Sequence, residues 1–136
     1  MASILKVDEL RGIVSAGDIT VTSEGGAATQ SLQQGLAKVW VNFNGTGTIA
    51  TVDSLNVSGL IDNAGGNYTV SYSSNMQSAG YALGNSGGDS GSVFECWLGT
   101  AYGLPTTSNT GLGTGYDTPV AADLSVVTSM IMGDLA

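Results

Sequence analysis

The stretch KVWVNFNGTGT, residues 38 to 48, decides how the rest of the chain is interpreted. Val39, Val41 and Phe43 occupy alternate positions, and Trp40 falls on the opposite face of this pattern. Because successive side chains of a strand point to opposite faces, a period of two indicates a strand with one buried face. The NGTG at residues 44 to 47 is typical of a hairpin turn. The stretch therefore predicts a strand that leads into an antiparallel hairpin.

Further segments of the same kind follow. DNAGGN, at residues 62 to 67, indicates a second turn. The segments with strand character are TIATVDSLNVSGLI (48–61), YTVSYS (68–73), YALG (81–84), SVFECWLGT (92–100) and LSVVTSMIMG (124–133). Short strands at this spacing, separated by Gly and Asn turns, predict a mainly β fold: a small antiparallel sandwich or barrel over residues 39–136.

One segment has a helical pattern. In residues 27 to 38, Ala28, Leu32 and Leu36 recur at intervals of four, and Val39 lies seven positions after Leu32. This spacing predicts a short amphipathic helix with an apolar stripe. A helix of two or three turns needs a partner surface to be stable. That surface is either a bundle of copies around a symmetry axis or the chain's own sheet, and the pattern leaves both open.

Residues 2 to 26 carry β-branched residues in rough alternation, with glycines between them, and we expect an extended arm. Such an arm buries too little surface to offset its own ordering, so it must lie on the domain or on another subunit. We therefore expect residues 1–38 to form an anchoring and oligomerising region before the β domain. Its expected apolar contact residues are Leu32, Leu36 and Val39.

The charge of the chain excludes some partners. The net charge is −8, and the only basic residues are Lys6, Arg11 and Lys38, which do not cluster. Nucleic acid and anionic membrane surfaces both require clustered cations, so we expect neither as a partner. No apolar run approaches the roughly 18 to 20 residues of a spanning helix, and we expect no membrane insertion.

GGDSGSV, residues 87 to 93, contains the Gly-Asp-Ser-Gly run that surrounds the nucleophile of chymotrypsin-like serine proteases. A serine hydroxyl needs a base to take its proton, and in that family the base is histidine. The chain has no histidine, and its lysines lie far from Ser90 in sequence. We therefore expect no catalytic residues, and interpret GNSGGDSG (84–91) as a glycine-rich turn. The 11 carboxylates leave a glycosidase formally open, but the chain is short for one.

Cofactor and metal sites are also not expected. Zinc requires Cys and His ligands, and the chain has only Cys96. We expect Cys96 to be buried as a small apolar side chain, with an intermolecular disulfide as the alternative. The spacing of Asp53, Asp62 and Asn63 does not match an EF-hand, although it leaves open a surface calcium ion bound mainly by backbone carbonyls.

Residues 99 to 123 form a 25-residue stretch without periodicity, rich in Gly and Thr. Loops of this length are uncommon and often functional. Tyrosines among small polar residues are typical of binding loops, while a crossover between sheets or a subunit contact is the alternative. The candidate surface-binding residues, from this stretch and the GDSG segment, are Asp89, Ser90, Tyr102, Asn109, Tyr116 and Asp117.

Residues 17–76 and 124–134 resemble a module of bacteriophage virion proteins, especially of marine and cyanobacterial phages. The elements that carry the resemblance are TVTSEGGAATQSLQQGLAK, the WVNFNGTGT hairpin, the DSLNVS and YTV pair, and the closing SVVTSMIMGD strand. They cover about half of the chain. Proteins of this kind are described as tail-fibre or structural proteins.

The resemblance implies a non-enzymatic, homotrimeric virion component with a C-terminal β-sandwich. It further implies an arm that docks on other virion proteins, and a particle assembled in the host cytoplasm. Because the chain has no shaft or repeat, we expect a short tail fibre or receptor-binding protein that contacts a host receptor or glycan. The alternative is a capsid or tail decoration protein that stabilises the particle.

Overall fold

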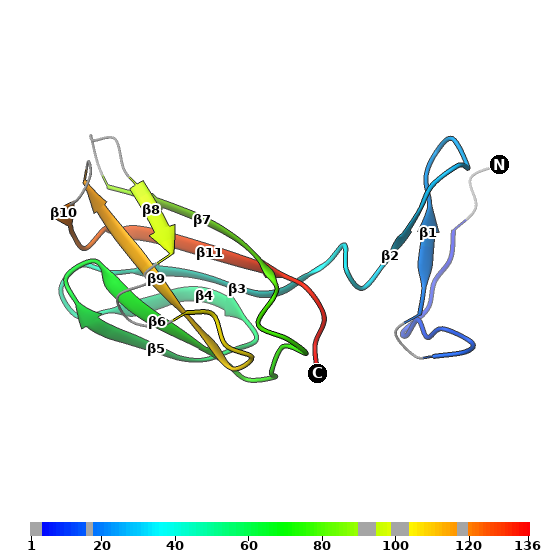
Figure 1. Cartoon of the computed structure of the whole chain (residues 1–136), viewed down its shortest axis with the longest axis horizontal. Coiled ribbons are helices and arrows are strands. Elements are labelled where there is room, and N and C mark those ends of the chain that lie inside the picture. The colour runs from blue at the N-terminus through cyan, green and yellow to red at the C-terminus, as the bar shows by residue number, and fades with distance from the viewer. Residues whose placement is uncertain (1–3, 16–17, 90–94, 99–103, 117–119) are drawn as a thin grey trace. The chain divides into compact units, whose positions relative to one another are not determined.

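The computed structural model describes residues 4–15, 18–89, 95–98, 104–116 and 120–136, with residues 95–98 described by their backbone. The chain divides into two compact units, Met1–Leu36 and Ala37–Ala136. The sequence analysis predicted this boundary after residue 38. Figure 1 shows the strands of both units.

The larger unit contains two antiparallel sheets. In the first sheet the strand order is β4-β3-β11-β7, so the last strand of the chain lies between β3 and β7. The bounds of these strands are Ala50–Leu55 for β4, Ala37–Asn44 for β3, Val126–Met132 for β11 and Ala82–Gly88 for β7.

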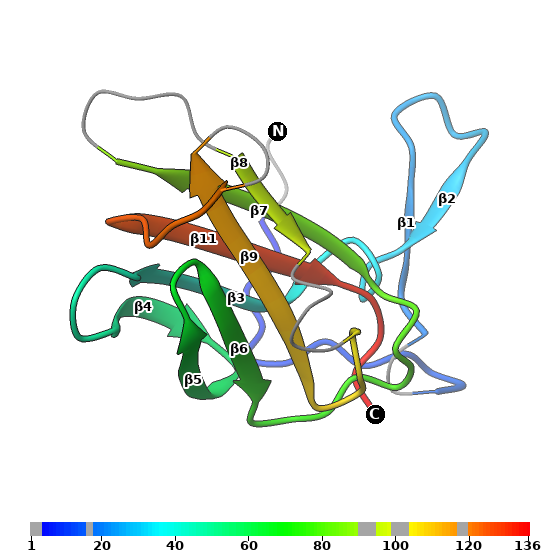
Figure 2. The same cartoon turned by 60° about the vertical axis from the view of Figure 1, so that its left-hand side comes forward.

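The second sheet has the order β10-β9-β6-β5, and β8 pairs with β9 on the edge opposite β6. Its strands are β5 (Val57–Ala64), β6 (Asn67–Tyr72), β8 (Glu95–Leu98), β9 (Asn109–Tyr116) and β10 (Val120–Ala121). Figures 1 and 2 show β9 of this sheet crossing in front of β11, and core residues of the two sheets pack together, so the sheets lie face to face. This is the arrangement of a β-sandwich, and the expected mainly β, antiparallel fold is confirmed.

The core follows the period of two that the sequence predicted. Every second residue of β3 is buried, from Val39 to Phe43, and Tyr68, Val70 and Tyr72 of β6 are buried in the same way. The other core residues are Met76, Leu112, Leu124, Val127 and Ile131. Trp40 lies on the outer face, as expected. Phe43 and Tyr68 meet edge to face across the two sheets, with ring centroids 5.0 Å apart.

Two buried tyrosines direct their hydroxyls to polar partners at the margins of the core. The Tyr68 hydroxyl donates to Asp123 Oδ1 at 2.7 Å, and the same oxygen accepts the Gly66 N–H at 2.6 Å. The hydroxyls of Tyr72 and Tyr81 lie 2.8 Å apart. Burial, followed by the hydrogen bond to Asp123, raises the pKa of Tyr68. Burial and the contact with Tyr81 raise the pKa of Tyr72.

The chain passes from one sheet to the other at Asn56, which separates β4 from β5. Asn56 adopts a φ of 58°, a conformation that asparagine tolerates better than most residues. Its side chain accepts the Ser74 N–H at 2.6 Å and donates to the Ser74 carbonyl at 3.0 Å. These two bonds fix the corner that connects the two sheets.

The helix expected over residues 27–38 is wrong. Thr29–Ser31 forms β2, which pairs with β1 (Thr20–Thr22), and Ala37 already begins β3. Between these strands lies a single turn, closed by the Gly35 N–H donating to the Ser31 carbonyl at 3.2 Å. The physical reason is that a short helix requires a packed apolar face, whereas Leu36 remains 54% exposed.

Two expected loops are also wrong in part. Residues 109–116 of the supposedly aperiodic stretch form β9, which pairs with both β6 and β8. Residues 84–88 of the supposed GNSGGDSG turn belong to β7, which pairs with β11. Both strands are rich in Gly, Ser, Thr and Asn, so they carry little apolar periodicity. These segments are strands because their backbones pair with neighbouring strands. A local sequence pattern does not reveal such pairing.

Candidate binding surface

The outer face of the β4-β3-β11-β7 sheet carries a surface that the sequence prediction did not include. Because β3 and β11 direct alternate side chains into the core, their intervening residues point outward. The strand register arranges these residues in two adjacent rows. The apolar row is Leu55, Trp40, Met130 and Gly84, and the polar row is Asp53, Asn42, Thr128 and Ser86.

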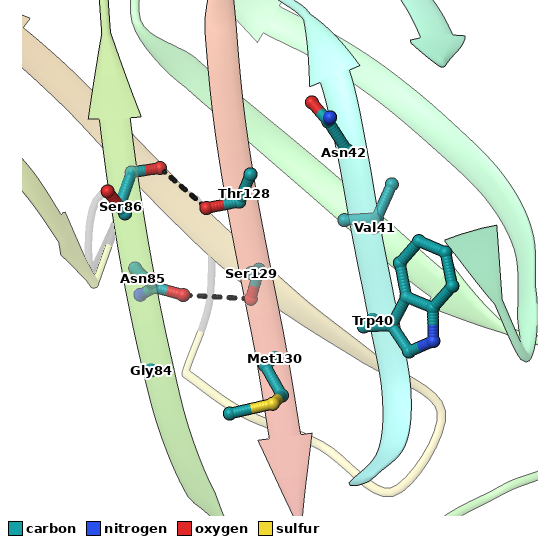
Figure 3. A pocket seen from close by; sticks show the side chains of 9 residues that line it. All are labelled: Trp40, Val41, Asn42, Gly84, Asn85, Ser86, Thr128, Ser129 and Met130. Atoms are coloured by element: carbon teal, nitrogen blue, oxygen red, sulfur yellow. Dashed lines mark hydrogen bonds between the residues drawn. The ribbon is translucent and has the colours of Figure 1, made fainter. Parts of the chain in front are cut away.

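A groove of about 340 Å³ crosses β3, β11 and β7 on this face. Figure 3 shows Trp40 and Met130 along one part of the groove and Asn42, Thr128 and Ser86 along the other. Gly84 helps to keep it open, since a Cβ added there would have no neighbouring atom within 4 Å. The remaining lining residues are Val41, Asn85 and Ser129. We call this the Trp40 groove.

The hydrogen bonds of the Trp40 groove leave two polar groups available. Thr128 Oγ1 donates to the Ser86 carbonyl at 3.2 Å, and Ser129 Oγ donates to Asn85 Oδ1 at 2.8 Å, as Figure 3 shows. Among the residues that the structure describes, the Asn42 amide and the Trp40 indole N–H make no side-chain hydrogen bond. The groove therefore presents an aromatic ring beside an amide and hydroxyl groups, all uncharged.

Of the residues predicted from the sequence to bind, the structure brings Asp89 and Tyr116 together. Asp89 Oδ2 accepts the Tyr116 hydroxyl at 3.1 Å, and Oδ1 accepts the Ser125 hydroxyl at 2.8 Å. The hydrogen bond to Asp89 is the main cause that raises the pKa of Tyr116. Asp89 thus connects the end of β7 to the end of β9 and to the residue before β11. This role of Asp89 is structural. The sequence did not predict the contact with Ser125, because the two residues lie 36 positions apart in the chain.

Asn109 lies at the other end of β9 from Tyr116. Seven residue steps along a strand correspond to about 24 Å, so Asn109 does not share a site with Asp89. The Asn109 N–H donates to Thr106 Oγ1 at 3.0 Å, in a turn that precedes the strand. Ser90, Tyr102 and Asp117 lie outside the described residues.

The three predicted oligomerisation residues do not share one face. Leu32 is half-buried in the turn after β2, and Leu36 is 54% exposed. Val39 is 1% exposed because it packs in the core of the sandwich. The Val39 side chain is therefore buried within its own domain and does not present a surface for contact with another subunit.

In the described part of the chain, no group of three or more His, Cys, Asp or Glu side chains is placed to hold a metal ion. Nor does that part contain a helix with the length and apolar character needed to cross a membrane. No protein-family model matches the chain. No curated protein matches its sequence, and no solved structure matches its fold.

Proposed function

We propose that the chain is a non-enzymatic structural protein of a bacteriophage particle, acting as a homotrimeric short tail fibre or receptor-binding protein. The resemblance of residues 17–76 and 124–134 to phage virion modules supports the location in the particle. The observation that carries the assembly role is the N-terminal unit, Met1–Leu36, whose described residues include no buried side chain.

Among residues 4–15 and 18–36, none is buried. The large apolar side chains of this unit that are at least half exposed are Ile4, Leu5, Val7, Leu10, Ile13, Val14, Val21 and Leu36. Ordering a backbone costs about 1 to 2 kcal/mol per residue, and burial of apolar surface is the main compensation. The unit therefore requires a partner surface, which other copies and neighbouring virion proteins supply.

The sandwich unit has a packed core and an open groove on one outer face, so it is suited to contact a ligand while the N-terminal unit assembles. Three copies held together carry three such grooves in one assembly. Linked sites of weak affinity then bind far more tightly than a single site.

The mass of the full chain in solution tests the assembly role. We expect light scattering to give three times the chain mass. Ile13→Asp with Val14→Asp should reduce it to the monomer, because both side chains are more than 90% exposed and available for contact. Val52→Asp is the matched control: Val52 is 69% exposed on β4, and this variant should remain trimeric. A wild-type monomer at all concentrations would contradict the proposal.

The copy number in purified particles tests the location. We expect quantitative mass spectrometry to find a small multiple of three copies per particle. A number in the hundreds would contradict the fibre role and indicate a decoration protein. Absence from purified particles would contradict both.

A further inference from the structure

We propose that the Trp40 groove binds a neutral saccharide. This proposal names the ligand class for the attachment role above and rests on it. The volume of about 340 Å³ lies within the range of small-ligand sites, which is roughly 300 to 1,000 Å³. The argument depends on three properties of the groove: its apolar row, its polar row and its charge.

The apolar row fits one face of a sugar ring. A pyranose presents C–H groups on a face and hydroxyls around its rim. Trp40 presents an aromatic ring at the solvent side of β3, with Met130 of β11 as its neighbour across the strand pair. The negative face of an aromatic ring attracts the weakly positive C–H groups. Gly84 then leaves space beside Met130 for the rest of the ring.

The polar row fits the rim of the same ring. A sugar hydroxyl both donates and accepts, so it requires partners of both kinds. The Asn42 side chain supplies a donor and an acceptor. Thr128 Oγ1 donates to the Ser86 carbonyl at 3.2 Å, which leaves its oxygen lone pairs as acceptors.

The charge of the groove excludes other ligand classes. All nine lining residues are uncharged, Asp53 of the polar row lies outside this lining on β4, and the chain has a net charge of −8. An anionic ligand would find no cation in the lining and would be repelled by the rest of the molecule. A lipid chain would leave the Asn42 amide desolvated without a partner.

A peptide is also a poor fit. An added strand needs free backbone groups at a sheet edge. Six of the nine lining residues belong to β3 and β11, and each of these strands is paired on both sides. β7 is the edge strand of the sheet, but it lines the groove on the face of the sheet. The groove therefore offers side-chain chemistry and not a strand edge.

Binding of the full-length chain to a defined glycan panel tests the proposal. The neutral members are maltoheptaose, cellohexaose, mannohexaose and a linear β-galactan, and the acidic members are sialyllactose and a heparin hexasaccharide. We expect binding to at least one neutral member and to neither acidic one. Titration calorimetry with the strongest neutral ligand then gives the affinity of each variant.

Trp40→Ala should weaken binding at least tenfold. Gly84→Val should do the same by filling the groove, and it is expected to fold because the new Cβ meets open space and valine favours strands. Gly25→Val is the matched control, since Gly25 in the N-terminal unit also has no atom within 4 Å of an added Cβ. It should bind like the wild type, and circular dichroism should show all three variants folded.

The proposal is overturned if no neutral member binds, if only acidic members bind, or if the folded Gly84→Val variant binds like the wild type. These outcomes are separate from those of the assembly test. A monomeric chain that binds a neutral glycan through Trp40 would contradict the trimer and support the site. A trimer that binds no neutral glycan would support the assembly role and contradict the proposed site.

Discussion

At the residue scale, the turn between β5 and β6 shows how one backbone position holds several strands. Gly66 has a φ of 70°, its N–H donates to Asp123 and its carbonyl accepts the Thr114 N–H at 2.8 Å. Asp123 in turn accepts the Tyr68 hydroxyl. This single glycine therefore connects the hairpin to β9 and to the segment that precedes β11.

Gly66→Ala should destabilise the protein by at least about 2 kcal/mol. A left-handed backbone disfavours a Cβ, and this Cβ would also contact the Thr114 carbonyl and the Ala122 backbone. Gly65→Ala is the control in the same turn, because a Cβ there meets no atom within 4 Å. It should change the free energy of unfolding by less than about 0.5 kcal/mol in urea titrations. Equal effects of the two substitutions would contradict this explanation.

The two buried tyrosines predict a loss of stability in alkali. Below about pH 10 tyrosine is protonated in both the folded and the unfolded chain, so the stabilisation is complete. Above it the unfolded chain releases these protons first, because burial raises the pKa of Tyr72 and Tyr68 in the folded state. The free energy of unfolding should therefore fall as the pH rises beyond about 10.

Tyr72→Phe removes one of these groups. Its free energy of unfolding should decline less steeply between pH 9.5 and 11 than that of the wild type, by up to about 1.4 kcal/mol per pH unit. Urea unfolding at each pH measures both slopes. Parallel slopes would show that Tyr72 does not titrate differently in the two states.

At the element scale, the sequence predicted strands that have large side chains at every second position. The prediction of β3 and β6 is confirmed for this reason. The turns predicted from Gly and Asn residues, after Asn44 and before Asn67, are confirmed as well. The sequence pattern could not predict β9, because its buried residues, Thr110 to Gly115, include a single large side chain, Leu112. A strand with neighbours on both edges is held by its backbone, so its side chains need not alternate.

β7 shows the same limit, and Asp89 at its end can be tested. Asp89→Ala removes the acceptor for Tyr116 and Ser125, so the end of β7 should separate more often from β9. We expect faster amide hydrogen exchange at Gly87 and Gly88 and a loss of about 1 to 3 kcal/mol of stability.

Asp53→Ala is the control for Asp89→Ala. The Asp53 carboxylate accepts only the N–H of its neighbour Ser54 among the hydrogen bonds that the structure gives it, at 2.8 Å and on an exposed edge strand. This variant should leave exchange in β7 unchanged. If Asp89→Ala also leaves exchange unchanged, the contact with Tyr116 and Ser125 does not hold the strand.

At the scale of the whole molecule, the two units differ in what stabilises them. Every residue of the core cluster comes from Val39 onward, whereas the described residues of Met1–Leu36 contain no buried side chain. The alternation of apolar residues could predict the β domain, whereas the N-terminal arm and its partners stay a prediction. The alternation could not predict the Trp40 groove, because Trp40, Gly84 and Met130 are brought together only by the register of β3, β11 and β7.

Removing residues 1–36 should therefore leave the sandwich folded. We expect a thermal midpoint within a few degrees of the wild type and a monomeric mass. The contrasting deletion, of residues 126–136, removes the strand between β3 and β7 and should abolish the cooperative transition. If the deletion of residues 1–36 also abolishes the cooperative transition, the core depends on the N-terminal unit.

The position of β11 also sets the order of events during synthesis. β3 pairs with β11, and about 80 residues separate the two strands along the chain. While the ribosome is still producing the intervening strands, β3 has no partner on that edge and its apolar face has no complete core. The sandwich can close only when residues 126–132 emerge, so a nascent chain stalled before them would expose an adhesive edge and would be a substrate for chaperones.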